Sequence, residues 1–187
     1  LSEGVLQDLG VAAMLHDVGY ASLPGGAAGL ERHPGEGSRL LLRQRGFHEA
    51  KLRRLRAVLD HHRDFAGPSG PPSLAGCLLR LADDYSNLLR LWPGKISPAD
   101  ALGAMVAAAG KLYHPVLAQL LVNALGRYPP GTLLELEDGR RARSVSPVRS
   151  QATFAAPLAR LQDPRAPAPG PVIDLAKGPR VKRALPG

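Results

Sequence analysis

Apolar residues recur at helical spacing through the first 125 residues of this chain, and few of them are aromatic. Between residues 2 and 18 the apolar positions lie on one face of a helix; they include Val5, Leu9, Ala12, Ala13 and Leu15. Aromatic residues make up only 4% of the 187 residues, so Leu, Ala and Val must form the core. The pattern predicts an all-α helical bundle as the main body.

Capping residues and helix breakers divide this part of the chain into segments. A helix over residues 2–18 is followed by a break at Pro24-Gly25-Gly26. Further helices are expected after His33-Pro34 up to Gly46, and over 48–62, 73–89, 97–109 and 115–125. Ser73 and Ser97 are typical N-cap residues at the starts of two of these helices. We expect one helical domain over residues 1–128.

The character of the sequence changes after residue 128. Of the 18 prolines, 10 lie in residues 129–187. Residues 132–137 alternate as in a short strand, and Asp138-Gly139 is a turn signal. We therefore predict a small β-rich extension over residues 129–175 and a disordered basic tail over residues 176–187.

The net charge of +8 is concentrated in this C-terminal part. Residues 1–138 carry 14 basic and 14 acidic residues, whereas residues 139–187 carry 10 basic and 2 acidic ones. A main domain without net charge argues against a dedicated nucleic-acid groove across it.

The remaining global features concern location and chain length. The single cysteine, Cys77, excludes an internal disulfide and fits a reducing, cytoplasmic compartment. No run approaches the ~18 apolar residues of a membrane span. The chain starts at Leu1 within a helical pattern, so we expect a fragment with a regulatory domain upstream of Leu1.

Histidines and aspartates of the kind that bind metals are ordered along the first half of the chain. They are His16, Asp17, His33, His61, His62 and Asp83. Borderline transition metals accept imidazole nitrogens and carboxylate oxygens together. Because a buried histidine or aspartate without a partner is strongly unfavourable, we expect the fold to gather these residues around metal ions.

The spacing of these residues suggests how two ions would be held. Asp17 has two carboxylate oxygens and can bridge the ions, which makes it the residue expected at the centre of catalysis. His16 and Asp83 would hold the first ion. His61 and His62, together with His33 from the loop before the second helix, would hold the other. A pair of metal ions ~3.5–4 Å apart is a site for hydrolysing phosphate esters.

The same residues lie in sequence blocks that resemble the HD-GYP domains, a branch of the HD metal-dependent phosphohydrolases. The run from Ala13 to Gly19 resembles the HD motif, and His33-Pro34 resembles the second block of that family. His61-His62 resembles its histidine pair, and the run from Arg80 to Asp83 resembles the helix with its last aspartate ligand. Residues 128–139 are similar to a β extension found after many such domains.

The resemblance implies an HD-domain helical bundle that hydrolyses cyclic di-GMP, a bacterial signalling dinucleotide. It implies two transition-metal ions, iron or manganese, and a metal-activated hydroxide as the nucleophile. Carried over to this sequence, His16 and Asp83 bind one ion, Asp17 bridges, and His33, His61 and His62 bind the other. One further histidine ligand of the family would lie upstream of Leu1.

Two departures from the family pattern leave alternatives open. Tyr20 stands where the family usually has a lysine that contacts substrate phosphate, and the Gly-Tyr-Pro signature is absent after His61-His62. Tyr20 and Arg63 are the residues we expect to contact substrate in this chain. The alternatives are a degenerate, non-catalytic signalling module that binds a nucleotide or a partner, and a hydrolase for another phosphoester.

Overall fold

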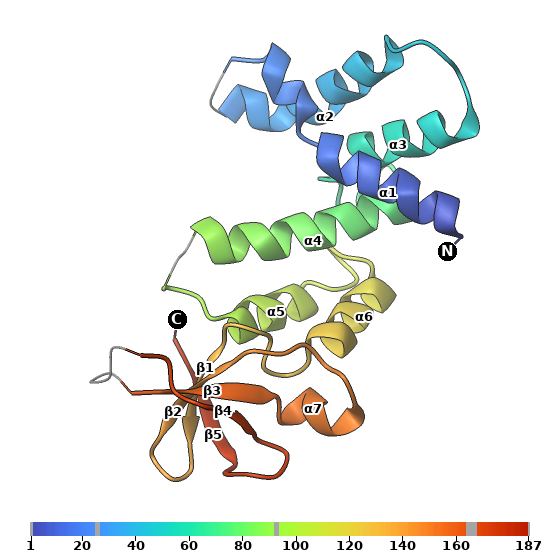
Figure 1. Ribbon diagram of the computed structural model, residues 1–187. Helices are drawn as coiled ribbons and strands as arrows, with labels where there is room; N and C mark the ends of the chain where they lie inside the picture. Colours follow the sequence, from blue (N-terminus) through green and yellow to red (C-terminus); the bar gives the residue numbers. More distant parts are fainter. Residues whose placement is uncertain (1, 25–26, 92–93, 164–167, 187) are drawn as a thin grey trace. The chain divides into compact units, whose positions relative to one another are not determined.

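Two units make up the part of the chain that the computed structural model describes, which is residues 2–24, 27–91, 94–163 and 168–186 (Figure 1). The first unit extends to Asp83 and includes Gly110–His114; the second contains Asp84–Ala109 and the chain from Pro115 onward. Part of the predicted break at Pro24-Gly25-Gly26, residues 25–26, lies outside the described residues.

The first unit is helical. It contains α1 (Glu3–Leu15), the short 3-10 helix η1 (Val18–Ser22), α2 (Ala27–Leu42), α3 (Glu49–Asp60) and the start of α4 (Leu74–Leu91). Its core consists of the buried side chains of Ala12, Leu41, Leu55, Ala57, Val58 and Leu79. Leu, Ala and Val form this core, as the composition predicts.

The predicted helix ends at the paired ligands are confirmed. α1 ends one residue before His16, and α3 ends one residue before His61. α4 begins directly after Ser73, whose hydroxyl accepts a hydrogen bond from the Gly76 N–H at 3.2 Å.

The predicted start of the second helix is wrong. α2 begins at Ala27, so His33 lies inside the helix and Pro34 lies in its interior, although proline there removes a backbone hydrogen bond. The helix continues through the proline because it buries one face: Gly29, His33, Gly37 and Leu41 follow one another at four-residue spacing and all are buried.

A close backbone contact within this unit joins η1 to α2. A Cβ atom added at Gly19 would lie 2.0 Å from the carbonyl oxygen of His33 and 2.7 Å from the nitrogen of Gly37. Only a residue without a side chain allows this approach. The contact places the turn that carries His16 and Asp17 against the middle of α2.

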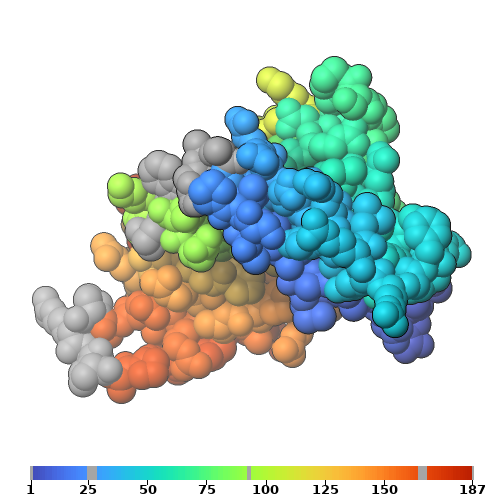
Figure 2. Space-filling model, turned by 90° about the horizontal axis from the view of Figure 1, so that it is seen from above, coloured from blue at the N-terminus to red at the C-terminus, as the bar shows by residue number. Residues whose placement is uncertain are grey.

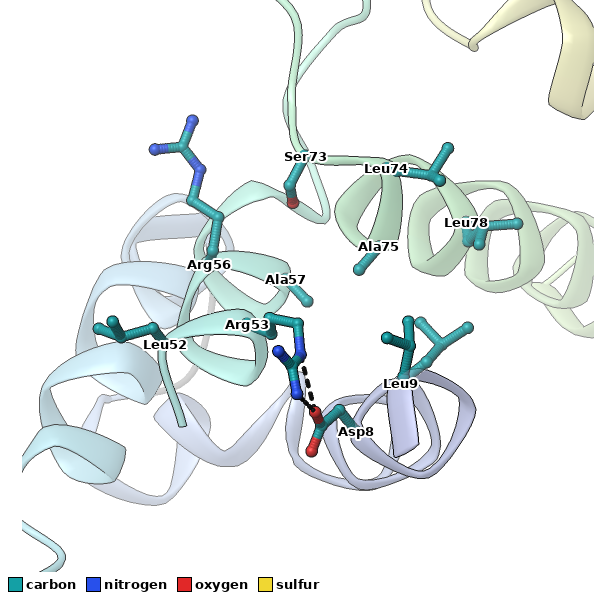
Figure 3. Close-up of a pocket in the computed structure, with 11 residues that line it drawn as sticks. Asp8, Leu9, Leu52, Arg53, Arg56, Ala57, Ser73, Leu74, Ala75 and Leu78 are labelled. Atoms are coloured by element: carbon teal, nitrogen blue, oxygen red, sulfur yellow. Dashed lines mark hydrogen bonds and ion pairs between the residues drawn. The ribbon is translucent and has the colours of Figure 1, made fainter. Parts of the chain in front are cut away.

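Ion pairs hold α1 to α3. The carboxylate of Asp8, in α1, accepts hydrogen bonds from the guanidinium groups of Arg53 and Arg54, at 2.6–2.9 Å. Figure 3 shows Asp8 and Arg53 beside an apolar pocket lined by α1, α3 and the start of α4. None of the six predicted ligands lines this pocket.

A buried lysine closes the C-terminal end of α2. The ammonium group of Lys51, in α3, donates hydrogen bonds to the backbone carbonyls of Leu42, Gln44 and Gly46. The Leu42 carbonyl is one of the last carbonyls of α2, which lack helical partners, and the other two lie in the turn that follows. The turn between α2 and α3 is therefore held by one side chain.

The second unit contains helices and a sheet (Figure 1). Its helices are the rest of α4, α5 (Pro98–Ala107), α6 (Pro115–Leu125) and α7 (Gln151–Ala155). The side chain of Ser97 accepts a hydrogen bond from the Asp100 N–H and caps α5, as predicted. The strands are β1 (Leu133–Leu136), β2 (Arg141–Ser144), β3 (Leu158–Gln162), β4 (Val172–Asp174) and β5 (Val181–Leu185).

The prediction of an all-α fold with only a small β appendage is wrong. The strands form one five-stranded antiparallel sheet in the order β4-β3-β2-β1-β5, with its own buried core of Leu134, Leu136, Ala142, Ala159 and Leu175. β5, which pairs with β1, comes from the segment expected to be a disordered tail.

The sequence signal for the sheet is weak because its strands are short and the inward residues of β2 and β3 are small. In β2 the buried Ala142 and Ser144 alternate with the exposed Arg141 and Arg143. The segment therefore lacks the alternation of large apolar and polar residues that is expected of a strand. Pairing with neighbouring strands compensates for this weak local signal.

Among the described residues, no helix has both the length and the apolarity that crossing a bilayer requires.

Substitution of Gly19 tests the contact between η1 and α2. Gly19→Ala should lower the free energy of unfolding by about 1–3 kcal/mol, because the added methyl group meets backbone atoms that cannot rotate away. Gly10→Ala is the control: nothing lies within 4 Å of its added Cβ, and alanine in α1 should raise stability by about 0.5–1 kcal/mol. Urea denaturation measures both, and equal effects of the two substitutions would contradict the packing described.

Candidate metal centre

The predicted ligands come from the ends or interiors of the helices of the first unit. His16 follows the last residue of α1, and Asp17 precedes η1. His61 and His62 follow α3, His33 lies within α2, and Asp83 lies within α4. The loop position predicted for His33 is therefore wrong, because the helix begins six residues earlier at Ala27.

Four of these side chains converge. One ligand atom from each of Asp17, His33, His61 and His62 lies within 4.8 Å of the others. The Nε2 atom of His33 is 3.2 Å from Asp17 Oδ1 and 3.2 Å from His61 Nε2, and His61 Nε2 is 3.8 Å from the same carboxylate oxygen. Three imidazoles and one carboxylate could hold a transition-metal ion.

His16 faces the second oxygen of the Asp17 carboxylate, and Asp83 lies beside both His16 and His62. The Nε2 atom of His16 is 3.4 Å from Asp17 Oδ2 and 3.7 Å from Asp83 Oδ1. The two oxygens of Asp17 thus face different histidines: Oδ1 faces His33 and His61, and Oδ2 faces His16. This arrangement suits a carboxylate that bridges two ions.

Backbone carbonyls orient three of the imidazoles. The Nδ1 atoms of His16, His33 and His61 lie 2.7, 2.8 and 2.6 Å from the carbonyl oxygen of the residue three positions earlier. A carbonyl oxygen can only accept, so each Nδ1 carries the proton. In the neutral ring the lone pair is then on Nε2, which faces the centre. Such a hydrogen bond is typical of metal-binding histidines.

The electrostatics of the centre favour a cation. α1 and α3 both end there, and the C-terminus of a helix carries a partial negative charge. The side chains of His33 and His61 are fully buried, and burial lowers the pKa of His61 to about 4, which keeps this ring neutral at pH 7. The hydrogen bond from Nδ1 to Val58 acts in the opposite direction but is the smaller effect.

Two features of the centre are unfavourable without a cation: a buried nitrogen without a partner and a contact between two nitrogens. His16 Nε2 is buried and has no hydrogen-bond partner in the described part of the chain. The Nε2 atoms of His33 and His61 face each other at 3.2 Å, and with both Nδ1 atoms bonded to carbonyls the lone pairs of two neutral rings would repel. A metal ion accepting these nitrogens would remove both problems. The residues present therefore fit a metal.

Tyr20 lies at the same centre. Its ring stacks on that of His33, with the centroids 4.1 Å apart and 14° between the planes. Burial raises the pKa of the Tyr20 hydroxyl, and the nearby charges of Asp17 and Asp83 raise it further. The phenol thus stays protonated and can donate a hydrogen bond close to the two carboxylates.

Arg63, the other residue predicted to contact substrate, makes structural hydrogen bonds. Its guanidinium donates to the carboxylate of Asp60 at 2.8 Å and to the carbonyls of Ser69 and Gly70 at 3.0 and 2.9 Å. These bonds hold the loop after His62. A contact of Arg63 with substrate stays a prediction.

Asp60, the last residue of α3, supports the centre and is not among the residues predicted from the sequence. Its fully buried carboxylate accepts hydrogen bonds from Arg56, Arg63 and the backbone N–H of Ser73, and so joins the end of α3 to the start of α4. Burial raises its pKa, but these hydrogen bonds outweigh burial and hold the pKa below its usual range. The positions of arginines four residues before and three residues after Asp60 were the signal available in the sequence.

The fold and the site together define a candidate metal-binding domain of helices with an attached antiparallel sheet. A search of curated proteins finds a similar protein named "Cyclic di-GMP phosphodiesterase PA4108", from Pseudomonas aeruginosa, which is 26% identical over an alignment 213 positions long. The match covers 99% of this chain and 49% of that protein, so the chain spans about half the length of this relative. No protein-family profile and no solved structure matches the chain.

The lowered pKa of His61 makes the stability of the metal-free protein depend on pH. Between the unfolded value near 6.5 and the folded value of about 4, the unfolded chain binds a proton that the folded chain does not. Stability should therefore fall as the pH decreases from about 6.5 to 4, by up to about 3 kcal/mol. The lowered pKa values of Asp8 and Asp60 add to this loss of stability from about pH 5 downward, in the parent and in a His61 variant alike.

Urea denaturation in the presence of a chelator at pH 7 and at pH 4.5 measures this dependence. His61→Gln should weaken it. His48→Asn, which removes an imidazole outside the centre and keeps a side chain able to cap α3, should not. An imidazole of His61 that titrates near 6.5 by NMR would contradict the burial argument.

Proposed function

We propose that this chain forms the catalytic part of a metal-dependent phosphodiesterase that hydrolyses a cyclic dinucleotide. The convergence of Asp17, His33, His61 and His62 carries the proposal, since three imidazole nitrogens and a carboxylate oxygen lie within 4.8 Å of one another. The relative from Pseudomonas aeruginosa, named as a cyclic di-GMP phosphodiesterase, supports the substrate class.

The proposed ligand sets follow the two sides of the Asp17 carboxylate. His33, His61 and His62 would hold one iron or manganese ion, His16 and Asp83 would hold the other, and Asp17 would bridge. Bound there, the ions would supply Lewis acidity that activates water as the nucleophile and neutralises charge on the phosphoryl oxygens. The carbonyl-bound Nδ1 atoms keep His16, His33 and His61 oriented, so these rings need little rearrangement to bind metal.

An open groove beside His62 can receive the substrate. It has a volume of about 570 Å³ and lies between α2 and the end of α3. Its lining includes three arginines, Arg32, Arg39 and Arg63, and two glutamates, Glu31 and Glu36. Arg32 and Arg39 share the single carboxylate of Glu36, at 4.0 and 3.0 Å. α2, blue on the colour bar, is exposed on the face of the molecule that Figure 2 shows.

The arginines of the groove and the hydroxyl of Tyr20 would bind different phosphate groups of the substrate. Exposed guanidinium groups can pair with phosphate oxygens along the groove. The hydroxyl of Tyr20, near Asp17 and Asp83, can donate a hydrogen bond to a phosphate oxygen at the centre. It supplies no positive charge, so binding of the second phosphate depends on the arginines.

Metal content and turnover measured together test the proposal. We expect the purified protein to contain iron or manganese by elemental analysis and to hydrolyse cyclic di-GMP. The double variant His61→Ala/His62→Ala should lose both properties, whereas His48→Asn should retain both. Tyr20→Phe should retain the metal and the ring stack but lose up to about tenfold in kcat/KM, the effect of one hydrogen bond.

The other outcomes separate the alternatives. Metal with hydrolysis of bis(p-nitrophenyl) phosphate but not of cyclic di-GMP would indicate another phosphoester substrate. Metal without any turnover would contradict the enzyme and support a non-catalytic binding module, which the lysine-to-tyrosine departure at Tyr20 also favours. A protein without metal would contradict the centre itself.

A further inference from the structure

Each of the three oriented histidines donates its Nδ1 proton to a backbone carbonyl of a helix. For two of them that carbonyl lies near the helix end, and for the third it lies in the helix interior. His16 and His61 directly follow the ends of α1 and α3, and their Nδ1 atoms lie 2.7 and 2.6 Å from the carbonyls of Ala13 and Val58. Near the end of a helix the last carbonyls have no backbone N–H four residues later to accept from. These two carbonyls are therefore available because the helix ends.

His33 has no such helix end. It lies inside α2, nine residues before the last residue, Leu42, yet its Nδ1 makes the same bond, 2.8 Å to the carbonyl oxygen of Leu30. In a regular helix that carbonyl would accept the N–H of residue 34. Residue 34 is proline, which has no N–H. The carbonyl of Leu30 is free for His33 because of Pro34.

We propose that Pro34 is a positioning residue for the metal centre: by withholding its backbone donor, it leaves the Leu30 carbonyl to hold the proton of His33 on Nδ1 and to turn Nε2 toward Asp17. The inference rests on the proposed metal-dependent function for its purpose, but the tautomer that it explains is a property of the metal-free protein.

The surroundings of His33 make this single bond decisive. The fully buried imidazole is 3.3 Å from the carbonyl of Gly29, a longer contact than the one to Leu30, and its face is covered by the ring of Tyr20. The stacked ring fixes the plane of the imidazole, but it does not decide which nitrogen carries the proton. The carbonyl of Leu30 decides it, and as a result Nε2 faces Asp17 Oδ1 and His61 Nε2, both at 3.2 Å.

The helix is weakened by this arrangement. A proline in a helix interior is among the most unfavourable substitutions for helix stability, and the residue before a proline also disfavours the helical backbone. A proline with no role beyond folding would be replaced by alanine with a gain in stability and no other effect. A positioning proline makes stability and metal affinity change in opposite directions.

The test compares Pro34→Ala with Gly35→Ala. Both substitutions place alanine in the interior of α2, and an added Cβ at Gly35 has nothing within 4 Å. Both variants should unfold at higher urea concentration than the parent. Only Pro34→Ala restores a donor for the Leu30 carbonyl. We expect it to lower the affinity for Mn²⁺, measured by calorimetry, by about 10–100-fold, as loss of an outer hydrogen-bond partner does, whereas Gly35→Ala leaves it unchanged.

A second measurement needs no metal. In the metal-free parent protein, ¹⁵N chemical shifts should show the His33 proton on Nδ1, and in Pro34→Ala a substantial fraction should move to Nε2. Unchanged tautomers, or equal Mn²⁺ affinities in a parent protein that binds Mn²⁺ and in Pro34→Ala, would overturn the inference. A tautomer change in a protein that binds no Mn²⁺ would uphold the role of Pro34 in orienting His33 and would overturn the proposed function instead.

Discussion

The contact between the backbones of Gly19 and α2 is the constraint on which the centre depends. Because Gly19 has no side chain, η1 lies directly against the carbonyl of His33 and the nitrogen of Gly37. The turn that precedes η1 carries His16 and Asp17, so this contact sets the distance from Asp17 to His33. The Asp60 carboxylate holds a second part of the centre in place. Its hydrogen bonds fix the end of α3 and thereby the positions of His61 and His62.

Backbone atoms also decide the chemistry of the ligands. Three carbonyls hold the protons of His16, His33 and His61 on Nδ1, and so the lone pairs of all three rings face the Asp17 carboxylate. Two of these carbonyls are free because a helix ends, and the third is free because a proline follows. The helix ends also bring partial negative charge to the place where a cation would bind.

Much of the candidate site can be predicted from the sequence because four of its six ligands, His16, Asp17, His61 and His62, lie just after helix ends. The ends of α1 and α3 at His16 and His61 are examples. The position of His33 could not be predicted from local rules, since His33-Pro34 indicates a helix start, and only the burial of every fourth residue of α2 keeps the helix continuous. The roles of Asp60 and of the Leu30 carbonyl depend on tertiary contacts and on a missing donor.

The sheet shows the same limit on a larger scale. β1 and the turn after it follow from alternation and Asp138-Gly139, but β2 and β5 are short and rich in arginine or lysine. β2 buries only an alanine and a serine, and β5 has no fully buried side chain. Nothing in these segments alone distinguishes a strand from a polar tail. Their antiparallel pairing with β1 on both sides makes them strands.

The central claim is that backbone-held histidines present Nε2 to a metal ion beside Asp17. Anomalous X-ray diffraction from crystals of the Mn²⁺-loaded protein tests it most directly. The account predicts a peak at ligand distance from Nε2 of His33, Nε2 of His61 and a carboxylate oxygen of Asp17, with the Nδ1 atoms still bonded to the Leu30 and Val58 carbonyls. A peak bound through Nδ1, or no peak among these side chains, would contradict it.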